Sequence, residues 1–116
     1  MKHELKIKRV YESPDQNDGR RILVDRLWPR GLTKEKAKIN LWLEDIAPST
    51  ELRKWYSHDP AKWGEFKQRY KIELKDRMEI IDRLRQESKT RAITLLFSAK
   101  ATELNNAVAL KEFVEQ

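Results

Sequence analysis

A continuous apolar run within residues 21–27 is the clearest sign of a buried strand in this chain. Ile22, Leu23 and Val24 follow one another without a polar residue between them, which is typical of a strand covered on both faces. A second run of this kind lies within residues 92–98. Because the chain between them is long enough for a helical crossover, we predict that the two strands are adjacent, parallel and central in one sheet.

Shorter patterns predict the elements around these two strands. Residues 5–10 alternate between apolar and polar, as a strand with one exposed face does, and residues 40–46 favour a short strand. Thr33 is suited to cap a helical turn that runs to Lys38, and a Pro-Ser-Thr segment precedes a helix predicted over residues 51–57.

The longest amphipathic pattern follows Asp59 and Pro60, residue types that favour the start of a helix. Beyond them, apolar residues recur at spacings of three and four: Trp63, Phe66, Tyr70, Leu74, Met78, Ile81 and Leu84. One helix over residues 60–87 would be ~42 Å long, which is long for a chain of this size, so we predict a break near residues 75–78. A last helix is predicted over residues 103–115.

Together these elements predict one α/β domain spanning residues 1–116. Their order indicates a small three-layer domain, with a mainly parallel sheet of three to four strands and helices on both faces. A length of 116 residues is ordinary for a single domain and sufficient to bury a core.

Composition narrows the chemistry that this chain can perform. The sequence has no cysteine, which excludes disulfides, thiolate nucleophiles and cysteine-bound metals. Its two histidines, His3 and His58, lack the spacing of metal ligands, and there is no glycine-rich phosphate loop, so we expect neither a metal nor a cofactor. No segment has the ~20 apolar residues needed to cross a bilayer, and we see no signal peptide, so we expect a cytoplasmic protein without a membrane partner.

The charge balance is basic, with 25 Lys and Arg against 19 Asp and Glu and a net charge of +6. The excess is spread over both halves of the chain and is not gathered in a tail. This balance permits binding of nucleic acid or phosphate but does not require it. A solvated surface of mixed charge is the simpler explanation for most of these residues.

Charged residues follow the first apolar run, at the position where ligands bind in open α/β sheets. Asp25 is suited to act as an acid, a base or an orienting group, and Arg26 is suited to clamp an anion. These two are our candidate catalytic residues. An equally weighted alternative is that each forms a separate structural ion pair between strand and helix.

Residues beyond both runs extend this candidate site. Arg30 and Lys100 would converge at one end of the sheet if the two strands are parallel neighbours. Thr102, at the expected start of the last helix, would place unpaired backbone N–H groups there. Asn105 and Asn106 could bond a ligand, or could satisfy the turn before the helix. We therefore predict an anion site at this edge. The simpler alternative is that Lys100 extends into solvent and binds nothing.

Two aromatic side chains are further candidates for ligand binding. Trp28 lies in the charged turn and could stack on a ring, although burial beneath the turn is the simpler explanation. His58 could transfer a proton, although a local role beside the predicted helix cap is more ordinary for a histidine there.

Motifs along nearly the whole chain resemble those of a known bacterial family. They include Arg9-Val10-Tyr11, Val24-Asp25-Arg26-Leu27-Trp28-Pro29-Arg30-Gly31, Ala47-Pro48-Ser49, Leu52-Arg53-Lys54-Trp55, His58-Asp59-Pro60 and Thr94-Leu95-Leu96-Phe97-Ser98-Ala99-Lys100. In this order and spacing they resemble the YeaO-like domain of unknown function. The resemblance implies a compact α/β fold and a cytoplasmic protein, but no substrate or reaction. Longer members of the wider superfamily often carry a cysteine after the last strand, so a thiol-dependent mechanism is closed to this chain.

Two classes of function fit these observations best. The leading hypothesis is a cytoplasmic protein that binds a small anionic ligand, such as a nucleotide or phosphate compound, at the carboxyl ends of its central strands; whether it also acts on that ligand as an enzyme is left open. The alternative is a nucleic-acid-binding or regulatory module that uses the net positive charge. A third reading is a structural partner of another protein, whose identity the sequence does not indicate.

Overall fold

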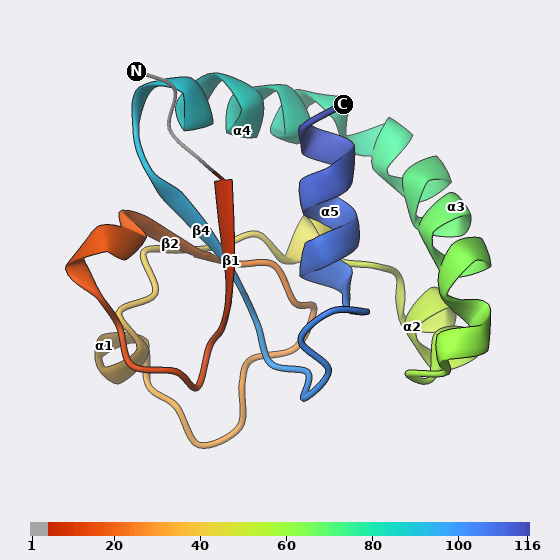
Figure 1. The fold of residues 1–116 in the computed structure, drawn as a ribbon, viewed down its shortest axis with the longest axis horizontal. Coiled ribbons are helices and arrows are strands. Elements are labelled where there is room, and N and C mark those ends of the chain that lie inside the picture. Colours follow the sequence, from red (N-terminus) through yellow and green to blue (C-terminus); the bar gives the residue numbers. More distant parts are fainter. Residues whose placement is uncertain (1–4) are drawn as a thin grey trace.

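Four parallel strands form the sheet at the centre of the molecule (Figure 1). The computed structural model describes residues 5–116, so Met1–Glu4, with His3 among them, lie outside the described residues. The strands are β1 (Leu5–Arg9), β2 (Arg20–Leu23), β3 (Leu41–Trp42) and β4 (Ile93–Phe97), in the order β1-β4-β2-β3. The prediction that the two apolar runs form adjacent, parallel, central strands is confirmed.

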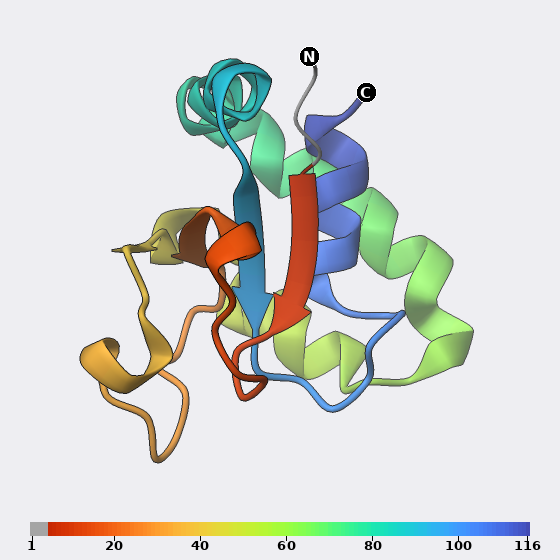
Figure 2. The same ribbon diagram turned by 60° about the vertical axis from the view of Figure 1, so that its left-hand side comes forward.

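Helices cover the two faces of the sheet unequally. The helices are α1 (Lys34–Ala37), α2 (Thr50–Tyr56), α3 (Trp63–Leu74), α4 (Met78–Thr90) and α5 (Asn106–Val114). One face carries α5, which contacts β1 and β4, with α3 and α4 packed against α5. The single-turn helix α1 lies on the opposite side of the sheet from α5 (Figure 2). The three-layer α/β fold predicted from the sequence is therefore present, with one thick helical layer and one thin one.

The long amphipathic segment is divided into two helices near residues 75–78, as its length predicted. A 3₁₀ turn over Lys75–Arg77 separates α3 from α4. At the start of the amphipathic segment, the Asp59 side chain accepts a hydrogen bond of 3.0 Å from the backbone N–H of Ala61. The first turn, Pro60–Lys62, is 3₁₀ and the α-helix proper begins at Trp63.

Three predicted elements have clearly different bounds in the structure. The central strand expected over residues 21–27 is Arg20–Leu23 and so ends four residues early. The strand expected over residues 40–46 has only two residues, because a 3₁₀ turn over Glu44–Ile46 follows it and turns Ile46 into the core. The last helix begins at Asn106, three residues later than predicted. The Asn105 side chain caps it by accepting from the N–H of Val108 at 3.0 Å, so Thr102 lies in the preceding loop.

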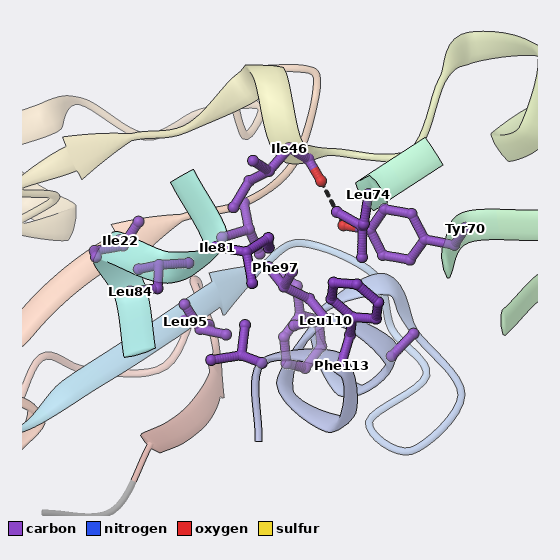
Figure 3. Close-up of a cluster of buried hydrophobic side chains, with 14 of the residues drawn as sticks. Ile22, Ile46, Tyr70, Leu74, Ile81, Leu84, Leu95, Phe97, Leu110 and Phe113 are labelled. Atoms are coloured by element: carbon purple, nitrogen blue, oxygen red, sulfur yellow. Dashed lines mark hydrogen bonds between the residues drawn. The ribbon is translucent and has the colours of Figure 1, made fainter. Parts of the chain in front are cut away.

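The main hydrophobic core lies between the sheet and the thick helical layer (Figure 3). Alternate side chains at the end of β2 and just after it face this core, as Ile22 and Val24 do, whereas Leu23 faces the other side of the sheet. Tyr70 is fully buried there, and its hydroxyl donates a hydrogen bond of 2.5 Å to the backbone oxygen of Ile46. Burial and the nearby carboxylates of Glu73 and Asp25 raise the pKa of Tyr70 far above its ordinary value, so this hydroxyl remains a donor.

The second face of the sheet buries charge as well as apolar side chains. Arg21 is 3% exposed, and its Nη1 lies 2.5 Å from the Asp18 carboxylate, which also accepts from Lys8 at 3.1 Å. The hydroxyl of Thr94 donates to the backbone oxygen of Asp18 at 2.7 Å. This cluster of Lys8, Asp18 and Arg21 fixes the loop before β2 to the sheet.

Within the part of the chain that the structure describes, no helix is both long and apolar enough to cross a membrane.

Candidate functional site

A cavity of about 150 Å³ opens at the carboxyl ends of β2 and β4. The arrowheads of β1 and β4 point to this end of the sheet in Figure 2. The lining of the cavity comes from the segments after β2 and β4, from the loop before α2, from α2 and the turn that follows it, from α3, and from the start of α5. The lining residues are Asp25, Arg26, Leu27, Pro48, Arg53, Tyr56, His58, Phe66, Ser98, Ala99, Asn105 and Asn106.

Two stacked aromatic rings form an apolar wall of the cavity. The rings of Tyr56 and Phe66 are 4.4 Å apart between centroids and nearly parallel, at 26°. The Tyr56 hydroxyl donates to the backbone oxygen of Leu104 at 2.9 Å. Burial and the neighbouring Asp59 carboxylate raise the pKa of this hydroxyl, so it stays protonated and keeps the Leu104 bond at neutral pH.

Asp25 joins three elements at the base of the cavity. Its Oδ2 accepts from the backbone N–H of Ser98 at 2.8 Å and from the Ser98 hydroxyl at 2.7 Å. Its Oδ1 accepts from Asn106 Nδ2 at 3.0 Å. Since both carboxylate oxygens are engaged, Asp25 is held in the orientation that links β2, β4 and α5.

The Arg26 side chain points away from Asp25 and toward the loop before α2. Its Nε donates to the oxygen of Pro48 at 3.0 Å, and its Nη2 donates to the oxygen of Ala47 at 3.1 Å. In residues 5–116 no ion pair joins Arg26 to Asp25. Because β2 ends at Leu23, strand alternation no longer governs these residues, and both line the same cavity.

Arg53 and His58 place positive and titratable groups at the rim. Arg53 is exposed and lies three residues before the buried Tyr56 on α2, so the two side chains are neighbours on the helix surface and both reach the cavity. His58 follows Ser57, and both have left-handed backbone conformations, with φ of 57° and 46°. This turn directs the chain out of α2 and leaves the His58 ring 6.2 Å from the Tyr56 ring.

The two asparagines at the start of α5 have different roles. Asn105 is buried and uses both ends of its amide, accepting from Val108 N and donating to the oxygen of Ala101 at 2.9 Å. Asn106 donates through Nδ2 to Asp25 and to the backbone oxygen of Val24 at 3.1 Å. Asn105 is therefore a helix cap, whereas Asn106 supports the end of β2.

The remaining sequence candidates lie outside the cavity lining. Arg30 and Lys100 are exposed in the loops after β2 and β4, and the backbone oxygen of Arg30 accepts from the Tyr11 hydroxyl at 2.8 Å. Trp28 is half-buried: its Nε1 donates to the oxygen of Leu32 at 2.7 Å, and its ring meets the Trp42 ring edge-on at 5.4 Å. The structure thus brings five of the eight candidates together: Asp25, Arg26, His58, Asn105 and Asn106.

Sequence reasoning missed the contribution of the helical layer. Arg53, Tyr56 and Phe66 line the cavity. The sequence placed Arg53 only in a motif, Tyr56 only in the helix predicted over residues 51–57, and Phe66 only in the core pattern. The spacing of three between Arg53 and Tyr56 was a usable signal, because it places a cation and an aromatic ring together on one side of a helix that packs near the sheet edge. No three His, Asp or Glu side chains of the described residues gather closely enough to hold a metal ion.

Comparisons with known proteins relate the whole chain to uncharacterised bacterial proteins. A family model described as the inactive DUF488-N3 subclade matches residues 4–116. The chain is 41% identical over 110 residues to the uncharacterised protein YeaO of Escherichia coli K12, which covers 95% of this chain and 96% of that protein. It is 36% identical over 110 residues to an uncharacterised protein of Mycobacterium tuberculosis, covering 95% and 92%. No solved structure shows a significant match to the chain.

Proposed function

We propose that this chain, which belongs to the DUF488-N3 family of YeaO-like proteins, binds a small organic anion at the carboxyl ends of its central strands. The observation that carries the proposal is the cavity itself, in which Arg53 and His58 stand beside the aromatic wall of Tyr56 and Phe66. A cation next to an apolar wall suits a carboxylate or phosphate attached to an apolar group. The proposed location of the protein is the cytoplasm.

The charges around the cavity favour an anion over a cation. Arg26 and Arg53 both line it, against the single carboxylate of Asp25, whose oxygens already accept three hydrogen bonds. The N-terminal end of α5 also lies there through Asn106, and its helix dipole adds positive potential.

Binding is favoured over catalysis in this proposal. The matching family model describes an inactive subclade, and this chain has no cysteine to serve as a nucleophile. Asp25 is held by Ser98 and Asn106, and Arg26 by backbone oxygens, so neither is poised to exchange a proton with a ligand.

We predict that Arg53→Ala weakens the binding of benzoate and of inorganic phosphate about ten- to a hundredfold, because one charge-assisted hydrogen bond is lost. Chemical-shift titrations that follow Ser98 and Asn106 measure the affinities. Arg83→Ala is the matched control, since Arg83 is an exposed arginine on α4 that pairs with Glu79 and does not line the cavity. Equal affinities in the wild type and Arg53→Ala would contradict the proposal.

The net charge of +6 supports a second candidate, a nucleic-acid-binding module. In that case affinity for DNA or RNA should fall steeply with salt, because bound Lys and Arg displace counterions from the phosphates. Fluorescence anisotropy with labelled oligonucleotides between about 50 and 200 mM salt measures this. A protein with many phosphate contacts loses roughly a thousand- to a hundred-thousandfold in affinity over that range. Absence of binding at the lowest salt excludes this candidate.

A further inference from the structure

We infer that the ligand is a planar acid with a single ring that also carries an N–H hydrogen-bond donor. This inference rests on the proposed function, because it concerns the same cavity. It adds three properties of the ligand: its size, its shape and the group that it presents to α5.

The interior of the cavity accommodates about one ring. A volume of about 150 Å³ matches that of engineered protein cavities that hold a single benzene molecule. A mononucleotide contains a base, a sugar and a phosphate, so most of it would remain outside. The cavity therefore fits a monocyclic acid better than the nucleotide that the sequence suggested.

The shape of the wall favours a flat ring. Tyr56 and Phe66 line the cavity with rings that are stacked on each other and only 5% and 2% exposed. A bound aromatic ring would therefore meet them edge-on, an arrangement that aromatic pairs favour. Leu27, Pro48 and Ala99 add apolar surface to the lining. Leu27 is 59% exposed, so a bound ring would also cover an apolar side chain that otherwise faces water.

The donor requirement comes from the fixed orientation of the Asn106 amide. Its Nδ2 donates to two oxygens, that of Val24 at 3.1 Å and Oδ1 of Asp25 at 3.0 Å. Reversing the amide would place its oxygen against both of these oxygens, so the orientation is determined by the hydrogen-bond network. The Asn106 Oδ1 is thus left as an acceptor. It receives no side-chain or backbone hydrogen bond within residues 5–116, and since it is not a fully buried atom it is accessible to water.

An acceptor in a mostly apolar cavity selects for a ligand that donates to it. Asn105, the neighbouring lining residue, offers no comparable group, because both ends of its amide are used within the chain. A ligand without a donor would remove Oδ1 of Asn106 from water without replacing the lost hydrogen bond. With the acid group of the ligand bound by Arg53, Oδ1 of Asn106 favours a ring that carries an amino group or a ring N–H.

The test compares benzoate with its three amino-substituted isomers and with cyclohexanecarboxylate, using chemical-shift titration of the full chain. We expect at least one aminobenzoate to bind about three- to tenfold more tightly than benzoate, the effect of one additional neutral hydrogen bond. Benzoate should bind more tightly than the non-planar cyclohexanecarboxylate. In Asn106→Leu, which removes the acceptor, the ratio of the best aminobenzoate to benzoate should fall to about one. Thermal unfolding checks that this variant is folded, and the comparison of ligands in the wild type does not depend on it.

The possible failures are distinguishable from one another. If benzoate and all aminobenzoates bind equally, the donor inference is overturned while the anion proposal stands. If cyclohexanecarboxylate binds as well as benzoate, the planar-ring inference is overturned. If phosphate binds but none of the ring acids does, the ligand class is wrong and the anion site is retained. If no anion perturbs Ser98 or Asn106 at millimolar concentration, the proposed function itself fails.

Discussion

Replacing Asp18 with alanine is expected to lower the free energy of unfolding by about 3–5 kcal/mol, the usual cost of removing one partner of a buried ion pair. The Asp18 side chain is 8% exposed and accepts from Arg21, whose side chain is 3% exposed, and from Lys8. Its loss would leave two cations close together on the second face of the sheet. One guanidinium nitrogen of Arg21, Nη2, is already buried without a hydrogen-bond partner among residues 5–116. Loss of Asp18 would leave Nη1 of the same guanidinium without its partner as well. Urea denaturation measures the change.

The same cluster predicts a loss of stability in acid. Burial by itself would raise the pKa of Asp18, but hydrogen bonds from the Asp15 N–H, Lys8 and Arg21 outweigh it and hold the pKa below the ordinary 3.8. A carboxyl whose pKa is lower in the folded state stabilises the fold above its unfolded pKa. That contribution is therefore complete above about pH 4 and disappears as the pH falls below 3.8 through the folded-state value.

Two comparisons isolate the effect of the buried charge. Asp82→Ala removes an aspartate that is 62% exposed and pairs with Arg85 on α4, so its unfolding free energy should change by less than about 1 kcal/mol. Asp18→Leu combined with Arg21→Met removes both charges and should cost less than Asp18→Ala alone. If Asp18→Ala and Asp82→Ala lose the same stability, the buried pair does not contribute as described.

The central strands were predictable because their signal is local and strong. Ile22, Leu23 and Val24 have no polar neighbour within the run, a pattern that is typical of a strand buried on both faces. The sequence also predicted the break after α3, because an unbroken helix would be too long for the domain. The start of α5 was misplaced because Thr102 and Asn105 are both good capping residues, and only the tertiary position of the preceding loop decides between them.

The part of the candidate site that directly follows a strand could be predicted, because that position is visible in the local sequence. Position after a strand identified Asp25 and Arg26, but not what their side chains would bind. Arg53 comes from a helix that is distant in sequence from both strands, and its place beside the cavity depends on how α2 packs near α3. The burial of Asp18 and Arg21 was also invisible, because charged residues beside a turn are usually exposed and only the folded loop brings them together.

The second large effect is expected at Gly19, which lies between the loop and the first residue of β2. Its backbone has φ of 65° and ψ of −134°, a region that is essentially restricted to glycine. A Cβ atom there would lie 2.2 Å from the backbone oxygen of Ala92, the oxygen that accepts from Arg20 N at 3.0 Å where β2 meets β4. Gly19→Ala must therefore displace the start of β2 as well as strain the loop.

We expect Gly19→Ala to lower the free energy of unfolding by more than about 4 kcal/mol, the range reached when backbone strain and a steric clash coincide. Gly31→Ala separates these causes, because Gly31 also has a positive φ, 81°, but a Cβ there would contact nothing within 4 Å. Strain alone should cost that variant about 1–2 kcal/mol. Gly64→Ala, within α3 and also without nearby atoms, should be neutral or stabilising by up to about 1 kcal/mol. Denaturant unfolding of all three variants tests this order. If Gly19→Ala costs no more than Gly31→Ala, then the close approach of residue 19 to Ala92 adds nothing to the cost of backbone strain.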